Sequence, residues 1–284
     1  MKHLTGALHV TVGHRAAGSY PRHVYCTPPF NLANISQDRD DPAVYMMTMS
    51  SSPGILDGDD LDVRVVAEPG SRLMLKNQGY QRVFNMQRGA RQKMELRLHG
   101  PSEISYIQQP VVPHKNAALY SRNTVRLEDD CVFTLGEIIT CGRKLCGEVF
   151  RFRRLHSITE VWHRDRLILK DNILLEPALV DVQGIGQAEG YSHQATLIHV
   201  NTRSGDVAAA KELAESILDA EDGLACGISQ PLPFLLVVRA LANGGEPLYD
   251  AFQKIEALLW KLNEPAAAPG IDRAATPLQA IQQG

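Results

Sequence analysis

Glu137 is the residue of this sequence whose type and setting point most directly to chemistry. It follows Gly136 inside the apolar run 132–139, where a carboxylate is costly unless it is paired, hydrated or used. One interpretation is therefore a functional carboxylate. The alternative is a structural ion pair, with Arg143 as the candidate partner, because most semi-buried carboxylates are simply satisfied.

Two segments imitate nucleotide-binding or catalytic motifs without completing them. Residues 184–190 (GIGQAEG) look like a dinucleotide loop, but the third glycine comes one residue late and residues 191–200 are typical of a strand instead of the required helix. His163-Arg164-Asp165 looks like a kinase catalytic loop, but Lys170 stands where the metal-binding asparagine belongs. We predict a glycine-rich hairpin or bulge at the first segment and a charged turn at the second.

Histidine and cysteine do not combine into a metal site or a nucleophilic centre. His193 and His199 lie six residues apart in a strand-like run, about 20 Å along the strand, which is too far to share a metal. Cys141 and Cys146 offer two thiolates without nearby partners, so buried or idle thiols are expected. No P-loop, H-E-x-x-H or G-x-S-x-G motif occurs. We therefore predict no catalytic residue, no resident metal and no enzymatic activity.

The composition excludes several classes of protein. The chain has 284 residues, 44% of them apolar, with 29 Lys+Arg against 32 Asp+Glu and a net charge of −3. This balance argues against nucleic-acid binding and against disorder, and the length allows one large domain or two small ones. Five cysteines are too few for a disulfide scaffold, and neither a signal peptide nor a membrane-spanning run is apparent. We expect a cytoplasmic protein with reduced thiols.

The elements that must position Glu137 are short strands up to about residue 200. Leu61, Val63 and Val65 alternate with polar residues, as do other runs, which is typical of strands with one buried face. Turn signals recur near residues 40, 70, 100 and 130, about 30 residues apart. This period favours a mainly β fold of layered, helically wound sheets like a β-solenoid. A plain antiparallel sandwich stays open as the alternative.

The texture changes after this β-rich region, 1–200. Apolar residues from Val207 to Leu218 and from Leu248 to Leu262 recur at helical spacing, with short apolar runs between them. We predict a C-terminal α/β segment with two helices over residues 201–264, packed on the layered region within one structural domain. The tail 265–284, rich in Ala, Pro and Gln, is predicted to be disordered.

Several segments, in order along the chain, resemble motifs of the UreD family of urease accessory proteins, called UreH in some organisms. Residues 52–59 (SPGILDGD) are similar to S-P-G-G-L-x-x-G-D, with Ile55 in place of a glycine. Residues 77–84 (NQGYQRVF) are similar to T-Q-[GA]-x-x-[KR]-[VI]-[YF]. Residues 106–113 (YIQQPVVP) resemble x-P-Q-P-x-I-P-F, with Gln108 for the first proline and His114 for the aromatic residue.

Two further segments extend the resemblance toward the C-terminus. Residues 136–143 (GEIITCGR), followed by 147–150 (GEVF), resemble E-x-x-x-x-G-R…G-E-x-F, and residues 238–241 precede a helix carrying Leu259-Trp260, like R-x-L…L-W. The motifs span most of the chain, about residues 50–262. The matching site candidates are Pro53, Gly54, Gly58, Asp59, Gln78, Gly79, Gln109, Pro110, Gly142 and Arg143.

The resemblance implies a non-enzymatic maturation factor. Members of the family form a complex with the accessory protein UreF and the GTPase UreG and dock it onto apo-urease. GTP hydrolysis by UreG then accompanies nickel transfer into a site completed by a carbamylated lysine. No tightly bound cofactor is implied, only nickel in transit, which a conduit must hold weakly through carboxylates, carbonyls and water. Glu137 is the candidate conduit residue.

Two other classes of function stay open. A β-solenoid enzyme acting on carbohydrate needs carboxylates about 5 to 10 Å apart; the pairs Asp59/Asp60 and Asp129/Asp130 are candidates, although both are typical of turns. A general protein-binding module is the other class. For a permanent scaffold we also expect an uncovered apolar patch, with the run 232–238 and the helix after it as the candidate.

Overall fold

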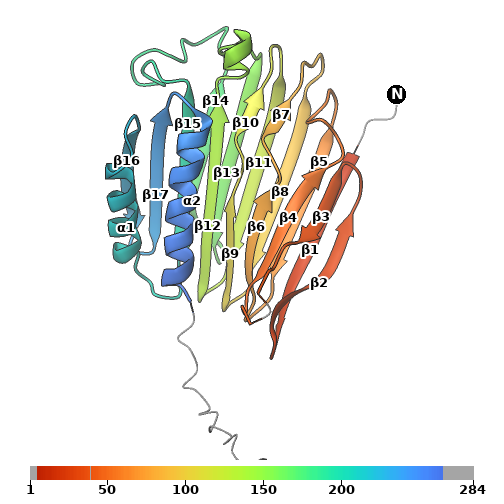
Figure 1. The fold of residues 1–284 in the computed structure, drawn as a ribbon, viewed down its shortest axis with the longest axis vertical. Coiled ribbons are helices and arrows are strands. Elements are labelled where there is room, and N and C mark those ends of the chain that lie inside the picture. Colours follow the sequence, from red (N-terminus) through yellow and green to blue (C-terminus); the bar gives the residue numbers. More distant parts are fainter. Residues whose placement is uncertain (1–4, 39, 265–284) are drawn as a thin grey trace, which may run out of the picture.

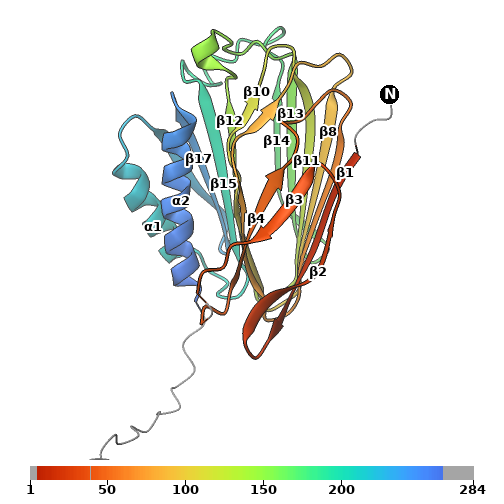
Figure 2. The same cartoon turned by 45° about the vertical axis from the view of Figure 1, so that its right-hand side comes forward.

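Alternating apolar side chains in consecutive strands build two β-sheets, which pack face to face with two helices on one outer side (Figure 1, Figure 2). The computed structural model describes residues 5–38 and 40–264, so the predicted disordered tail lies outside the described residues.

Sheet A has seven strands in the order β14-β13-β11-β8-β5-β1-β2: β1 Thr5–Arg15, β2 Gly18–Cys26, β5 Asp60–Ala67, β8 Ala90–Leu98, β11 Ala118–Leu127, β13 Arg154–His163 and β14 Arg166–Leu175. Sheet B follows the order β16-β17-β15-β12-β9-β6-β4-β3, with β10 pairing β12 and β7: β3 Phe30–Asn34, β4 Val44–Ser50, β6 Arg72–Asn77, β7 Gln81–Val83, β9 Ser102–Ile107, β10 Val111–Pro113, β12 Cys131–Thr140, β15 His193–Asn201, β16 Ala225–Leu232 and β17 Leu235–Ala242.

The central strands repeat as layers about 30 residues apart. In sheet A, Asp60 of β5 pairs with Arg91 of β8, and Arg91 pairs with Tyr120 of β11, always in parallel. In sheet B, Arg72 of β6 pairs in parallel with Glu103 of β9. The predicted mainly β, layered fold is confirmed, and the antiparallel sandwich is wrong for these strands. The two sheets stay open at their edges and do not close into a tube.

Each layer turns at both ends of the molecule. Tight turns at residues 69–70, 100–101 and 129–130, where turns are predicted, lead from a sheet A strand to the next sheet B strand. Longer crossovers at the opposite end return from sheet B to sheet A: 51–59, 78–89, 108–117 and 141–153.

The outermost strands depart from this parallel plan. β2 and β14 in sheet A and β3 and β16 in sheet B all pair antiparallel with their neighbours. The pairings of β2, β14 and β16 carry register shifts, and β3 is only five residues long. The layered block therefore ends in irregular or short strands on every edge.

The two predicted helices are confirmed as α1 (Ala208–Asp219) and α2 (Gly245–Leu262). Both cover the outer face of sheet B (Figure 2), where their apolar residues share a core with strands β15 and β17. α2 begins two residues before Pro247, which sits in its first turn. Neither helix of the described chain combines the length and apolarity needed to cross a membrane.

The run 232–238 is not an uncovered patch, which corrects the expectation from sequence. Leu235, Leu236, Val237 and Val238 are fully or almost fully buried in β17. Alternate members face the inter-sheet core and the helix-covered core, because β17 has a buried layer on both sides. A continuous apolar run here indicates a doubly covered strand.

Of the two imitated motifs, the charged turn is confirmed, whereas the glycine-rich segment is a loop and not the predicted hairpin or bulge. Residues 164–165 are the turn of the β13–β14 hairpin. Residues 184–190 belong to a loop of consecutive turns and lead into β15, a strand, so a pyrophosphate would meet no helix N-terminus there.

Candidate functional site

Four of the motif segments lie in the crossovers from sheet B to sheet A or at the ends of the sheet B strands that lead into them. The short strands β7 and β10 run within two of these crossovers, at the upper end of the molecule (Figure 1). Val83 of β7 bridges Ile55 and pairs with Pro113 of β10, while Val111 of β10 pairs with Ile139 of β12. This parallel ladder brings motifs that are about 30 residues apart in sequence side by side.

Several motif residues have roles set by backbone geometry. A Cβ atom on Gly54 would lie 2.4 Å from the carbonyl oxygen of Arg82, so only glycine allows this close crossing. Gly58 has φ of +83° and donates its N–H to the carbonyl of Gly89. The buried Asp59 carboxylate accepts the N–H of Leu56 at 2.7 Å and fixes the turn before β5.

Other motif residues shape a surface hollow beside the ladder. Pro53, Gly54, Gln78 and Gly79 all line a cavity of about 260 Å³. A Cβ atom on Gly79 would meet nothing within 4 Å, so its backbone is open to this hollow. The hollow is also lined by Thr48, which lies on the inward side of β4.

The third motif connects the ladder to helix α2. The N–H of Gln109 donates to Asn77 Oδ1 at 3.3 Å, and the carbonyl of Pro110 accepts the N–H of Gln81 at 3.0 Å. The Pro110 ring lies beside Gly245, the first residue of α2. The motif thus packs against the first residue of α2.

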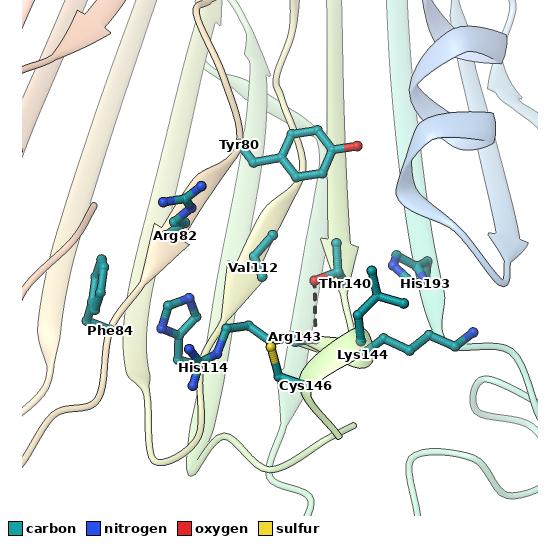
Figure 3. Close-up of a pocket in the computed structure, with 12 residues that line it drawn as sticks. Tyr80, Arg82, Phe84, Val112, His114, Thr140, Arg143, Lys144, Cys146 and His193 are labelled. Atoms are coloured by element: carbon teal, nitrogen blue, oxygen red, sulfur yellow. Dashed lines mark hydrogen bonds between the residues drawn. The ribbon is translucent and has the colours of Figure 1, made fainter. Parts of the chain in front are cut away.

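A larger cavity of about 810 Å³ lies at the end of the fourth motif (Figure 3). Tyr80, Arg82 and Phe84 border it on one side and Arg143 and Lys144 on the other, with His114 between them (Figure 3). Leu145 lines this cavity and is fully exposed on the 3-10 helix η1 (Lys144–Cys146).

Arg143 does not pair with Glu137, which corrects one of the two interpretations from sequence. Its guanidinium donates to Glu148 instead, with Nε 2.9 Å from Oε2, and this contact lowers the pKa of Glu148 to about 2. Gly142, with φ of +111°, turns the chain between strand and η1, so Arg143 projects from the crossover while Glu137 points between the sheets. The alternation of side-chain directions holds only within the strand. It therefore cannot predict where Arg143, six residues after Glu137 and beyond the end of β12, points.

Polar side chains cross the interior between the two sheets at one level, and we call them the polar belt. Sheet B contributes one residue from each of six neighbouring strands, and sheet A contributes inward-facing residues from four. The members are Thr48, Asn77, Tyr106, Glu137, Thr196 and Arg239 in sheet B and Gln92, Ser121, Asn123, Ser157, Thr159 and Asp171 in sheet A.

The polar belt separates two apolar clusters. On β11, for example, Leu119 belongs to the upper cluster and Val125 to the lower one, with Ser121 and Asn123 between them. A polar layer inside a sandwich costs stability unless its members bond to each other or to water.

Hydrogen bonds join the belt across the gap and along each sheet. Ser157 Oγ donates to Glu137 Oε1 at 2.7 Å, and the guanidinium of Arg239 donates to Asp171 Oδ1 at 2.8 Å. Within a single sheet, Asn77 Nδ2 donates to the Tyr106 hydroxyl at 2.8 Å and Asn123 Nδ2 to Thr159 Oγ1 at 2.9 Å.

Glu137 is the most solvent-accessible residue of its strand, β12. Every other residue of β12 is buried, whereas Glu137 is half-buried. Burial raises the pKa of Glu137 to about 7, opposed by the hydrogen bond from Ser157 and reinforced by the Asp171 carboxylate. The carboxyl group therefore titrates much closer to neutral pH than an ordinary glutamate.

Hollows adjoin the belt at both edges of the sandwich. Thr48 and Asn77 line the 260 Å³ hollow beside the motifs. Thr196 and Arg239 line another of about 500 Å³ at the opposite edge, under the loop 176–192. Gln194 lines this second hollow, and its buried Nε2 has no hydrogen-bond partner among the described residues. Such an orphaned donor marks a place for water or a polar guest.

The profile of the family described as UreD urease accessory protein matches residues 4–273. The chain belongs to this family. A urease accessory protein UreD from Flavobacterium johnsoniae is 48% identical over 257 residues, which cover 90% of this chain and 93% of the relative. UreD of Acetivibrio thermocellus is 30% identical over 240 residues (83% and 90%), and UreH of Helicobacter pylori is 29% identical over 244 residues (85% and 89%). Family membership supports a role in urease maturation.

In the described part of this UreD family member, no three His, Cys, Asp or Glu side chains are grouped so that they could hold a metal ion. Cys141 is buried, which raises the pKa of its thiol, and Cys146 is exposed. Burial, reinforced by the charge of Lys144, lowers the pKa of His193 to about 4, and burial alone lowers that of His199 to about 4. Both imidazoles are thus neutral at pH 7.

The carboxylate pairs considered for a carbohydrate enzyme lie in or next to turns in this UreD fold. Asp59 fixes a turn and is buried, while Asp60 is exposed at the start of β5. Asp129, in the turn 129–130, binds His163 and Arg164. Neither pair faces the cavities described above.

Sequence reasoning found one member of the polar belt, Glu137, and missed the others. A signal existed, because Gln92, Ser121 and Ser157 each interrupt the apolar positions of an alternating strand. Recognising it requires the register, which aligns Gln92 with Ser121 and Ser121 with Ser157. The register is a property of the layered pairing and not of any one strand.

Proposed function

We propose that this protein is a non-enzymatic scaffold of urease maturation in the cytoplasm. In this proposal it forms a complex with UreF and the GTPase UreG, docks on apo-urease and assists GTP-dependent insertion of nickel into the active site. Nickel is cargo in transit and not a bound cofactor. Family membership supports the role in maturation.

The polar belt is the observation that carries the nickel part of the proposal. It provides oxygen donors through an otherwise apolar sandwich, with a hollow at each edge. One hollow is lined by Pro53, Gly54, Gln78 and Gly79, all of them family-motif residues. Carboxylate, hydroxyl and amide oxygens bind nickel more weakly than a cluster of imidazoles or thiolates would, which suits a path that must release its cargo.

Glu137 is suited to transient binding for a second reason. With its pKa near 7, the carboxylate loses a proton when a cation arrives and regains it when the cation leaves. The neighbouring Asp171 already forms an ion pair with Arg239. The carboxylate of Glu137 is therefore the one more readily available to a passing cation.

The test compares Glu137→Gln with a matched control, Glu256→Gln. Glu256 also accepts a hydrogen bond from a serine, Ser105 at 2.5 Å, but it lies on α2 outside the polar belt. Each variant would be co-expressed with UreF, UreG and apo-urease, and complex assembly, bound nickel and urease activity after addition of nickel and GTP would be measured.

We expect both variants to assemble, because the amide of glutamine still accepts the serine hydroxyl. Glu137→Gln should lower nickel transfer and urease activity together, while Glu256→Gln leaves them unchanged. Full activation with Glu137→Gln would refute the conduit. Urease that matures equally well without this chain would refute the maturation role itself.

A further inference from the structure

The outer face of sheet A carries a groove lined by positive charge, which we call the cationic groove. It has a volume of about 520 Å³ and lies where β8, β11 and β13 begin. Its charged and polar lining residues are Arg88, Arg91, Lys93, Tyr120, Arg153, Arg154 and His156, and no Asp or Glu lines it.

Several of these charges are not neutralised within the described chain. The side chains of Arg91 and Lys93 are exposed and make no ion pair or hydrogen bond among the described residues. Arg153 donates to the carbonyl of Gln87 at 2.9 Å, which orients the guanidinium without cancelling its charge. Arg154 is paired with Glu176 at 3.2 Å.

The acidic residues nearest in the sheet do not cancel this charge. Asp60 and Asp62 of β5 lie in register beside the two exposed cations but do not line the groove. Asp62 is already held by His9 and Arg64. The groove is lined by four arginines and one lysine in a chain whose net charge is −3. Arg88 is paired with Asp57 at 3.6 Å, so three of the five cations have no acidic partner among the described residues.

A second hollow adjoins the groove and adds apolar side chains to a partly polar lining. It has a volume of about 840 Å³ and shares Arg153 with the cationic groove. Its apolar lining residues are Met86, Phe150, Phe152, Pro177 and Ala178, and its other polar lining residues are Asn85, Gln87, Asn116 and Arg151. Guanidinium groups bind carboxylates in a planar, two-pronged manner. A segment with carboxylates next to apolar side chains would match both surfaces, whereas a nucleic-acid backbone has nothing to place against the apolar side chains of the second.

We infer that the cationic groove is a docking site for an acidic protein segment in which apolar residues accompany the carboxylates. This function goes beyond nickel transfer, since the groove lies on the outer face of sheet A and the polar belt on the inner face. Electrostatic complementarity of this kind mainly raises the association rate and selects the partner.

The test uses a fluorescein-labelled peptide of repeated Glu-Glu-Leu triplets, with a labelled oligothymidylate of equal length beside it. The full-length protein would carry Arg91→Glu/Lys93→Glu or the milder Arg91→Gln/Lys93→Gln, which keeps the test valid if charge reversal disturbs folding. The matched control is Arg166→Glu/Lys261→Glu, which changes two exposed cations elsewhere by the same charge.

We expect the peptide to bind the wild type in a salt-dependent manner and to lose about tenfold in affinity with the Glu variant, less with the Gln variant. The control should change affinity less than about twofold. Equal losses in the control, or no binding to the wild type, would overturn the inference. So would tighter binding of the oligothymidylate with the same loss, since that result assigns the groove to nucleic acid.

Discussion

The hydroxyl of Ser157 in sheet A donates to the carboxylate of Glu137 in sheet B, across 2.7 Å of the gap between the sheets. The acceptor lies on a strand that is otherwise buried, beside the Asp171 carboxylate, and has no basic partner among the described residues. The pair therefore makes the protein sensitive to proton concentration near neutrality, and the first prediction follows from this.

Glu137 should make the folded protein less stable as pH rises. Its pKa is raised from 4.5 to about 7 in the fold, so its contribution is fully present below about pH 4.5 and is lost as pH rises through 7. Glu137→Gln mimics the neutral form. Urea unfolding should show equal stabilities at pH 4.5 and a variant more stable by up to about 3 kcal/mol at pH 8. A pH-independent difference would contradict this.

Two motif glycines should respond differently to alanine. Gly54→Ala places a methyl group 2.4 Å from the Arg82 carbonyl oxygen and should cost about 1 to 3 kcal/mol in unfolding free energy. Gly79→Ala meets nothing within 4 Å and should change stability by less than about 0.5 kcal/mol. If Gly79→Ala still lowers urease activation, the exposed backbone of the motif acts in recognition. Equal costs would show that the crossing of the two crossovers is looser than described.

The buried ion pair between Arg72 and Glu103, 2.7 Å apart, should be costly to break. Arg72 also stacks on Trp260 and donates to its carbonyl, which ties sheet B to the end of α2. Arg72→Met leaves the Glu103 carboxylate uncompensated, at about 3 to 5 kcal/mol.

The pH dependence and a double variant check the cause of that loss. Burial already raises the pKa of Glu103 to about 7, and removal of Arg72 raises it further, so the loss should be smaller at pH 5 than at pH 8. Arg72→Met/Glu103→Leu should recover most of the stability. A double variant as unstable as the single one would assign the loss to packing on Trp260.

The apolar run of β17 should behave as core. Leu235 is 0% exposed, so Leu235→Ala should lower the unfolding free energy by about 2 to 5 kcal/mol. Leu145 is fully exposed at the 810 Å³ cavity, and Leu145→Ala should leave stability within about 0.5 kcal/mol. The stabilities of both variants would be measured by thermal unfolding. A loss below about 1 kcal/mol for Leu235→Ala would indicate that the run is an exposed apolar patch and not a buried strand.

The layered fold could be predicted because its period is written in turn residues. Pro69-Gly70, Gly100-Pro101 and Asp129-Asp130 mark one end of each layer, and the apolar alternation marks the strands between. Parallel pairing could not be derived from alternation, since both parallel and antiparallel strands alternate when one face is buried.

The site could be predicted only in part, because the sequence does not show in which direction a side chain points once the chain has turned. Glu137 stands out because its neighbours in β12 are apolar, but its partner Ser157 lies 20 residues away in the other sheet. Arg143 was the nearer cation in sequence, yet a glycine turn at Gly142 points it to Glu148. The cationic groove was missed because net charge averages over the whole chain and hides where the charges gather.

The antiparallel strands at the edges of both sheets have a consequence for self-association. A stack of identical parallel layers offers backbone donors and acceptors to any further strand, including one from another copy of the chain. In this protein, a strand added at an edge would have to pair with β2, β14 or β16, each of which has a register shift, or with β3, which has only five residues. These edge strands disfavour the addition of further strands. The layered sheets therefore do not extend from one copy of the chain to the next to form a fibril.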